Sequence, residues 1–369
     1  GKVLTAYKSK EKTHTLLPDV VEIGANAFAG ASAYNYESEY RSENSTNPNN
    51  FWGVIEQVIV PEDSQLEVIG DMAFRYCGNL RTINFPSSLK KIGRNAFEYC
   101  MSLDKVVLPE GISEIGSSAF QACYKLSSIN IPSTITALGG SAFNMPNSGS
   151  TMGFGSLPGG GAAAMNLPYS VLSTVTFADC NITAINSYTF ARTAITEITL
   201  PKAIDTIGNN AFAGCSKLVT INGVGVKTVG RNAIFDKCVS LKNVNLPSLT
   251  NLGTGTTTNS MFNGCTALEE FTVPAGVTAL TGFYKCTSLK KITLVAPENI
   301  TEIKSYAFRG CTSLVDFTIP ENVKSIGMGA FAETGIETAT IPAQITAIGE
   351  SVFEDAKSLK TVTFVDNGV

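Results

Sequence analysis

The sequence predicts a repeat solenoid of about thirteen coils, built from one short unit that recurs along nearly the whole chain. Three observations lead to this prediction. A phenylalanine returns at intervals of mostly 21 to 23 residues, eight of the nine cysteines stand three residues after such a phenylalanine, and 44% of the residues are hydrophobic while 16% are charged. That composition can fill one long continuous core. The recurring phenylalanines are Phe28, Phe74, Phe97, Phe120, Phe143, Phe190, Phe212, Phe235, Phe262, Phe283, Phe308, Phe331 and Phe353.

Each unit begins with a predicted β-strand. In the unit that starts at Leu80, the apolar residues Ile83 and Phe85 alternate with polar ones, which is the pattern of a strand with one buried face. A proline follows directly, here Pro86 and in the next unit Pro109. Because proline has no N–H to donate, it ends strand pairing where the chain must turn.

The second half of each unit predicts a tight corner followed by a short turn or helical turn. Leu89 and Ile92 form a second apolar pair, and Gly93 permits the corner because glycine has no Cβ. A polar residue then stands where a short helical turn would need an N-terminal cap, before an alanine and the recurring phenylalanine. Such residues include Asn95, Ser118 and Asn210.

The cysteines favour a ladder of buried free thiols over disulfides or a metal site. A CxxC redox or metal site needs two thiols close in sequence, whereas these lie about one repeat apart. Where the position is not cysteine it is usually small, which is typical of a buried slot stacked from coil to coil. The eight cysteines are Cys77, Cys100, Cys123, Cys215, Cys238, Cys265, Cys286 and Cys311.

The combined motif, I-P-x-x-V/I-x-x-I-G-x-x-A-F-x-x-C-x-x-L, resembles the BspA-like class of leucine-rich repeats from about Val20 to Phe364. The resemblance implies a right-handed superhelix with a parallel β-sheet on its concave side and turns or helical turns on its convex side. It also implies a secreted protein of the bacterial cell surface that adheres to host proteins or other cells. The sequence departs from ordinary leucine-rich repeats because it lacks their asparagine ladder.

The two ends of the chain lead to different expectations. Residues 1–22 are predicted to be N-terminal capping strands, with Val3–Tyr7 and Thr13–Leu17 forming a hairpin or paired strands, and residues 23–369 are the solenoid. After Thr361–Val369 no capping hairpin or polar helix follows. We therefore expect either end-to-end self-association at the C-terminal coil or a truncated chain.

Two insertions interrupt the repeat, at 29–52 and 144–169. The second is glycine-rich and typical of a tolerated loop. The first is rich in aromatic residues that the core does not require, and exposed aromatic side chains often contact ligands. Alternatively, its aromatic residues pack the loop against the first coils. The candidate ligand-binding residues are Tyr34, Tyr36, Tyr40, Phe51 and Trp52.

Several function classes are not supported by the sequence. The single histidine, His14, offers neither a catalytic triad nor a metal cluster, so we expect no catalytic residues, no cofactor and no metal. The net charge is −4 and no basic stripe is visible, which argues against nucleic-acid binding. No run of about 18 apolar residues predicts a membrane span.

The strand faces and the insertions together suggest a function. Outward positions such as Asn84, Asn130 and Thr340 form a Thr/Asn row suited to mutual hydrogen bonding, which we interpret as structural. The sequence thus predicts a non-enzymatic extracellular or cell-surface module that binds or adheres to a protein or carbohydrate ligand. The alternative is a structural spacer that displays another domain away from the cell envelope.

Overall fold

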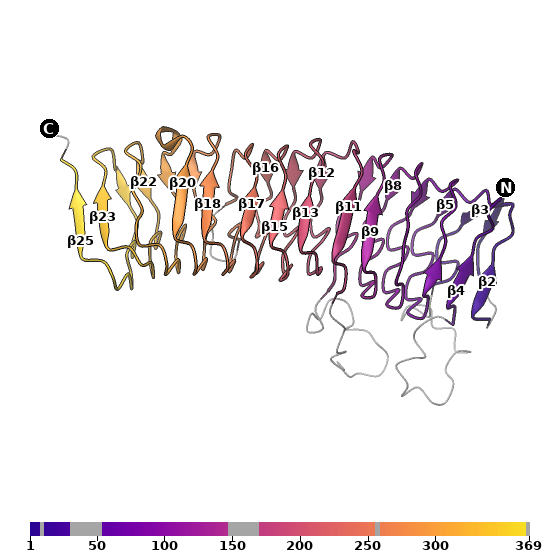
Figure 1. Ribbon diagram of the computed structural model, residues 1–369. Coiled ribbons are helices and arrows are strands. Elements are labelled where there is room, and N and C mark those ends of the chain that lie inside the picture. Colours follow the sequence, from indigo (N-terminus) through magenta and orange to yellow (C-terminus); the bar gives the residue numbers. More distant parts are fainter. Residues whose placement is uncertain (8–10, 30–53, 147–169, 255–258, 367–369) are drawn as a thin grey trace, which may run out of the picture. The chain divides into compact units, whose positions relative to one another are not determined.

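The computed structural model describes residues 1–7, 11–29, 54–146, 170–254 and 259–366. It confirms the predicted solenoid: parallel strands from successive coils pair with one another, and about thirteen coils of roughly 23 residues follow in sequence (Figure 1). The chain divides into two compact units, Gly1–Ile182 and Thr183–Val369, which we call unit 1 and unit 2 and describe separately.

The first column of strands is the one that the sequence predicts. Its members pair in parallel, with Thr174 beside Ser128 and Phe177 beside Ile131 as one example of the register. In unit 1 the column comprises β2 (Thr13–Thr15), β4 (Gln57–Ile59), β6 (Thr82–Ile83), β9 (Ser128–Ile131) and β11 (Thr174–Phe177). In unit 2 it comprises β13 (Glu197–Thr199), β15 (Thr220–Asn222), β17 (Asn243–Asn245), β18 (Glu270–Val273), β20 (Lys291–Leu294), β23 (Thr338–Ile341) and β25 (Thr361–Phe364).

A second column of parallel strands lies behind the first and differs from the single sheet that we expected (Figure 1). Most of its strands have two residues, too few to show alternation in the sequence. In unit 1 they are β1 (Lys2–Leu4), β3 (Val20–Ile23), β5 (Val68–Ile69), β7 (Lys91–Ile92), β8 (Glu114–Ile115) and β10 (Ala137–Leu138). In unit 2 they are β12 (Ala184–Ile185), β14 (Thr206–Ile207), β16 (Thr228–Val229), β19 (Ala279–Leu280), β21 (Glu302–Ile303), β22 (Ser325–Ile326) and β24 (Ala347–Ile348).

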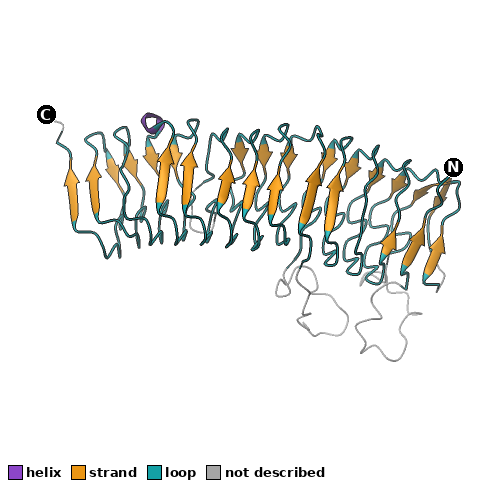
Figure 2. Cartoon of the chain, viewed as in Figure 1, coloured by secondary structure: helices purple, strands orange, loops and turns teal. Residues whose placement is uncertain are grey.

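Apart from the 3-10 helix η3 (Pro297–Asn299), seen in Figure 2, the turns between the columns are not helical in the described part of the chain. The predicted helix caps are therefore wrong. Asn95, Ser118 and Asn210 instead have φ of 53°, 57° and 54°, in the left-handed region that glycine, asparagine and aspartate tolerate best. These residues form turns, and turns favour the same polar residue types as helix caps.

Backbone hydrogen bonds between successive turns form a third ladder. The N–H of Asn95 donates to the carbonyl of Ser117 at 2.9 Å, and the N–H of Phe97 donates to the carbonyl of Ala119 at 2.7 Å. Two residues after the phenylalanine, the N–H of Tyr99 also donates to the following coil. The turns are thus held to the next coil as the strands are, and their polar groups are satisfied without a helix.

The recurring phenylalanines form one stack within each unit. Phe97 lies between Phe74 and Phe120, with ring centroids 5.0 and 5.2 Å away, and all three side chains are fully buried. In unit 2 the stack runs from Phe190 to Phe353 with centroid separations of 5.4 to 5.8 Å. The stack explains the repeat period, because each coil must supply one ring to cover its neighbours.

The cysteines are free and buried, and their position has a specific hydrogen-bonding role. The Cys100 thiol donates to the carbonyl oxygen of Phe74 in the preceding coil at 3.1 Å, and the Cys238 thiol donates to that of Phe212 at 3.2 Å. Burial raises the pKa of the Cys215 thiol to about 11. A small side chain with a weak donor therefore fits this position, and the thiols are kept protonated.

The two N-terminal strands do not pair with each other, as the predicted hairpin or pair of strands would. β1 pairs with β3 and β2 pairs with β4, both in parallel, so the segment forms the two strands of a first coil. Tyr7 occupies the position of the recurring phenylalanine: its ring stacks on Phe28 at 4.8 Å, and its N–H donates to Ala27 at 2.7 Å. The His14 ring lies 4.9 Å from Tyr7, and burial lowers the pKa of His14. The domain boundary at residue 22 stays a prediction.

At the other end of the described chain, β25 presents apolar side chains to solvent. Phe364 is 65% exposed, and Ile348, in the preceding strand β24 of the second column, is 45% exposed. End-to-end self-association through this coil stays a prediction.

The outward row of the first column includes asparagines that bind the neighbouring coil. The Asn84 side-chain amide donates to the carbonyl oxygen of Val60 at 2.7 Å and accepts the N–H of the same residue at 2.9 Å. Asn130 makes the same pair of bonds with Leu108. Both pairs join adjacent coils of unit 1 through an asparagine side chain. The structural interpretation of the row agrees with these contacts.

Candidate functional site

The five candidate ligand-binding residues, Tyr34, Tyr36, Tyr40, Phe51 and Trp52, lie outside the described residues, so their role stays a prediction. The residues that flank both insertions are described. Ala29 directly follows Phe28, and Pro146 stands three residues after Phe143. Both insertions therefore start at the same corner of the solenoid, just beyond the phenylalanine stack of unit 1.

Between these two points, the same corner carries a cluster of aromatic and sulfur-containing side chains. We call it the Tyr–Met corner; it consists of Tyr76, Tyr99, Met101, Tyr124 and Met145. These residues stand two or four positions after a recurring phenylalanine. The repeat places that part of every coil along one edge, so residues far apart in sequence become neighbours.

Contacts within the Tyr–Met corner are close. The rings of Tyr76 and Tyr99 stack with centroids 5.3 Å apart, and the guanidinium of Arg75 lies 4.7 Å from the Tyr76 ring centroid. The Tyr124 hydroxyl donates to the carbonyl of Pro146 at 2.8 Å, at the base of the second insertion. Tyr99 and Tyr124 are buried, whereas Tyr76 is partly exposed. The Tyr–Met corner is thus a packed cluster of tyrosine and methionine side chains from successive coils of unit 1.

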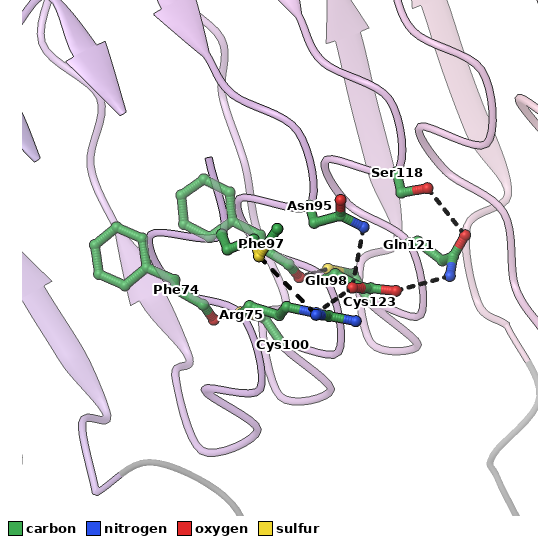
Figure 3. A network of polar contacts seen from close by, with 10 residues as sticks. Phe74, Arg75, Asn95, Phe97, Glu98, Cys100, Ser118, Gln121 and Cys123 are labelled. Carbon is green, nitrogen blue, oxygen red and sulfur yellow. Dashed lines mark hydrogen bonds and ion pairs between the residues drawn. The ribbon is translucent and has the colours of Figure 1, made fainter. Parts of the chain in front are cut away.

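Next to the Tyr–Met corner, the buried carboxylate of Glu98 is the centre of a hydrogen-bond network that joins three successive coils (Figure 3). Glu98 is 5% exposed, and its Oε2 accepts hydrogen bonds from Arg75 Nε and from Asn95 Nδ2, the latter at 3.0 Å. Gln121 Nε2 donates to Oε1 at 3.0 Å, and the Ser118 hydroxyl donates to the Gln121 carbonyl oxygen at 3.2 Å. Both carboxylate oxygens are occupied, so the network holds adjacent coils in register.

Burial dominates the electrostatics of this network. Loss of water around Glu98 raises the pKa of its carboxyl, and the attraction of Arg75 offsets this only in part. Burial also raises the pKa of the neighbouring Tyr99 hydroxyl.

Only two members of the Tyr–Met corner, Tyr76 and Met101, are partly exposed, and these two can contact a ligand. The Tyr76 ring, with the Arg75 guanidinium over it, can pack against a sugar ring or an apolar group of a protein. Among the described residues, no group of three histidine, cysteine, aspartate or glutamate side chains is placed to hold a metal ion. Nor does any helix in the described ranges have the length and apolarity needed to cross a membrane.

Reading the sequence residue by residue missed the Tyr–Met corner. Tyr76, Tyr99 and Tyr124 stand about one repeat apart, each inside what looks like an ordinary turn. The signal becomes visible only when the repeats are aligned on their phenylalanines. The second or the fourth position after the ring, or both, then contains tyrosine or methionine in four consecutive coils.

Comparison with known proteins agrees with the repeat. The family model described as "BspA type Leucine rich repeat region (6 copies)" matches residues 47–152, 183–294 and 281–368. None of the curated proteins matches the chain in sequence.

Solved structures agree in fold. A leucine-rich repeat protein from Bacteroides ovatus has a TM-score of 0.64 and 23% identity, with 95% of this chain and 86% of that chain covered. A leucine rich cell surface protein from Faecalibacterium prausnitzii has a TM-score of 0.53 and 24% identity, with 99% and 91% covered.

Proposed function

Because the chain belongs to the family of BspA-type leucine-rich-repeat proteins, we propose that it is a non-enzymatic adhesion module displayed at a cell surface. Its ligand is a protein or a carbohydrate. The proposal depends on the Tyr–Met corner, a packed cluster of aromatic and methionine side chains. It lies between the starting points of two insertions, which the repeat does not need. The proposal also extends to this chain the cell-surface location named for the protein from Faecalibacterium prausnitzii.

We propose that the ligand contacts the first insertion. Tyr34 and Tyr36 stand two residues apart, so in an extended segment their rings would lie on the same side. Tyr40 would add a third ring, and Phe51 and Trp52 would anchor the return of the segment to the solenoid. Tyrosine and tryptophan supply large contact areas with a polar group at one edge, which suits both sugars and protein pockets.

The test begins with a screen of the whole chain against a glycan array and a panel of extracellular-matrix proteins. The variant in which Tyr34, Tyr36 and Tyr40 are changed to serine is then measured against the ligand found. We expect its affinity to fall at least about tenfold, because aromatic contacts of this kind dominate many interfaces. The matched control changes the same number of tyrosines in unit 2, namely Tyr188, Tyr284 and Tyr306, to serine.

Each outcome of this test has a clear reading. Unchanged affinity in a folded triple variant, or an equal loss in the control, would remove the insertion as the binding site. A screen without any ligand would favour the alternative function, a structural spacer that displays another domain.

A further inference from the structure

In unit 2, the position two residues after the recurring phenylalanine alternates between a long cation and glycine. This position has a left-handed backbone in each of these coils, with φ of 60° at Arg192, 55° at Lys237 and 57° at Lys285. The intervening coils have glycine there, at Gly214, Gly264 and Gly310. We call Arg192, Lys237 and Lys285 the basic row.

The glycines make room for the stems of the cations. A Cβ added at Gly214 would lie 2.9 Å from Cγ of Arg192, and one at Gly310 would lie 3.2 Å from Cγ of Lys285. At Gly264 the nearest contact would be Cγ of Lys237, at 3.8 Å. Each stem therefore extends over the glycine of the next coil.

The backbone does not require cations at these positions. Glycine adopts the left-handed conformation without a steric penalty, and every second coil uses it. Other coils have tyrosine or an acidic residue in the same left-handed conformation, namely Tyr76, Tyr99 and Glu333, so the backbone does not select for cations and their presence calls for another explanation. Binding is such an explanation, because Lys237 and Lys285 are exposed and Arg192 is partly exposed.

The groups around the basic row are an acid, a tyrosine ring and several hydroxyls; the Lys285 ammonium lies 5.3 Å from the centroid of the Tyr284 ring. Asp236 is the neighbouring acid; burial raises its pKa, Lys237 opposes this shift, and Asn263 Nδ2 donates to its Oδ1 at 2.7 Å. Two residues beyond the row position, the Lys285 coil and the glycine coils have hydroxyl side chains that are exposed or partly exposed, whereas the other two cation coils have Ala194 and Val239. The hydroxyl side chains are Ser216, Thr266, Thr287 and Thr312; that of Thr312 already donates to the carbonyl oxygen of Thr287 at 3.2 Å.

The basic row has a defined end. In the last part of unit 2, Glu333 takes the row position with φ of 56°, and its carboxylate accepts a hydrogen bond from Arg309 at 2.7 Å. Glu354 lies 3.8 Å from the same guanidinium. Arg309 is thus paired with acids of the following coils, whereas the acid near the basic row is Asp236.

The spacing of the row selects the kind of ligand. Adjacent parallel strands lie about 4.8 Å apart, so cations in alternate coils lie about 10 Å apart, close to the length of a disaccharide in an extended chain. A nucleic acid strand instead carries a charge about every 3.4 Å, most of which such a row would leave unpaired. We propose that the basic row binds a sulfated linear polysaccharide, with the hydroxyls contacting sugars between the charged groups.

Sulfated polymers fit better than carboxylated ones because each sulfate group has more oxygens that can accept hydrogen bonds from a cation and from a hydroxyl at the same time. The whole chain has a net charge of −4, which repels any polyanion at long range. Direct contacts at the basic row must therefore supply the attraction. This inference goes beyond the proposed function, because it concerns a different surface and none of the residues assigned to the first insertion.

The test measures heparin affinity of the full chain and two triple variants at physiological salt. In the first variant Arg192, Lys237 and Lys285 are changed to glutamine, which keeps the stems and removes the charges. In the matched control Lys202, Lys227 and Lys324, exposed cations elsewhere in unit 2, are changed to glutamine. We expect at least about a tenfold loss in the first variant and less than about twofold in the control. Thermal unfolding confirms that both variants fold.

Four results would overturn the proposal: no heparin binding by the unaltered chain, unchanged affinity in the basic-row variant, equal losses in the two variants, or hyaluronate or single-stranded DNA binding as tightly as heparin. The last two mean a general electrostatic attraction. Because the tyrosines of the first insertion are untouched, failure here leaves the proposed function standing.

Discussion

The equivalent corner of the coil, two residues after the recurring phenylalanine, is built differently in the two units. In unit 1 it carries Tyr76 and Tyr99 stacked above a buried Glu98 network, and in unit 2 it carries long cations laid over glycines. The backbone is left-handed at this position in both units. The comparison shows that the phenylalanine stack fixes the coil while leaving the corner free to vary. Variation at that edge is how such a protein can present different surfaces on one scaffold.

The largest effect should come from the part that both units share. Changing Phe97 to alanine should lower the free energy of unfolding by about 3–5 kcal/mol, because the ring is fully buried between two others. Changing the exposed Phe364 to alanine should cost less than about 0.5 kcal/mol. Urea unfolding followed by circular dichroism measures both. A cost below about 1 kcal/mol for Phe97 would mean that the stack is not the common core.

A smaller effect should separate unit 1 from unit 2. Changing Glu98 to alanine should cost about 1–3 kcal/mol, because it leaves the Arg75, Asn95 and Gln121 donors without their acceptor. Changing the exposed Glu337, paired with Lys360 at the surface, to alanine should cost less than about 1 kcal/mol. Equal costs in the two variants would contradict the structural role of the network.

The pH dependence of stability gives an independent check on Glu98. Its pKa is raised in the folded protein, so the folded state holds a proton more tightly than the unfolded chain does. This contribution to stability is fully present below the ordinary pKa of 4.5 and is lost as pH rises through the higher folded value. The unaltered protein should therefore lose stability relative to the Glu98→Gln variant across that range. The raised pKa would be contradicted if the free energy of unfolding of the unaltered protein, relative to that of the variant, stayed constant or increased with pH.

The smallest effect concerns strain at the corner of unit 2. Changing Lys237 to glycine should raise the free energy of unfolding by about 0.5–1 kcal/mol, because relief of the left-handed strain exceeds the entropy cost of glycine. Changing Lys202, outside the left-handed positions, to glycine should lower it by about 0.5–1 kcal/mol. Urea midpoints of the two variants should therefore move in opposite directions. Movement in the same direction would remove the strain argument.

Sequence alone predicted the parts of this molecule that repeat with one residue type. Phe97 and Cys100 mark their slots by identity, and both are buried as expected. The second strand column was missed because β7 and its equivalents have two residues, too few for a period. The turn at Asn95 was mistaken for a helix cap because the same polar residues serve both.

The surface was harder to predict because its neighbours are distant in sequence. Arg192, Lys237 and Lys285 stand about two repeats apart, so no basic cluster appears in a linear reading. Similarly, each tyrosine of the Tyr–Met corner stands alone in its turn. The aromatic insertion was visible because its residues are contiguous, although the five candidate residues lie outside the described ranges.

The most direct test of the account is a crossed affinity measurement. The variant with Tyr34, Tyr36 and Tyr40 changed to serine and the basic-row glutamine variant are each titrated with heparin and with the ligand found by the screen. The account predicts that each variant loses affinity for one ligand only: the basic-row variant for heparin, and the tyrosine variant for the screened ligand. If both variants lose affinity for both ligands, or neither variant loses affinity for either, the first insertion and the basic row are not separate binding surfaces.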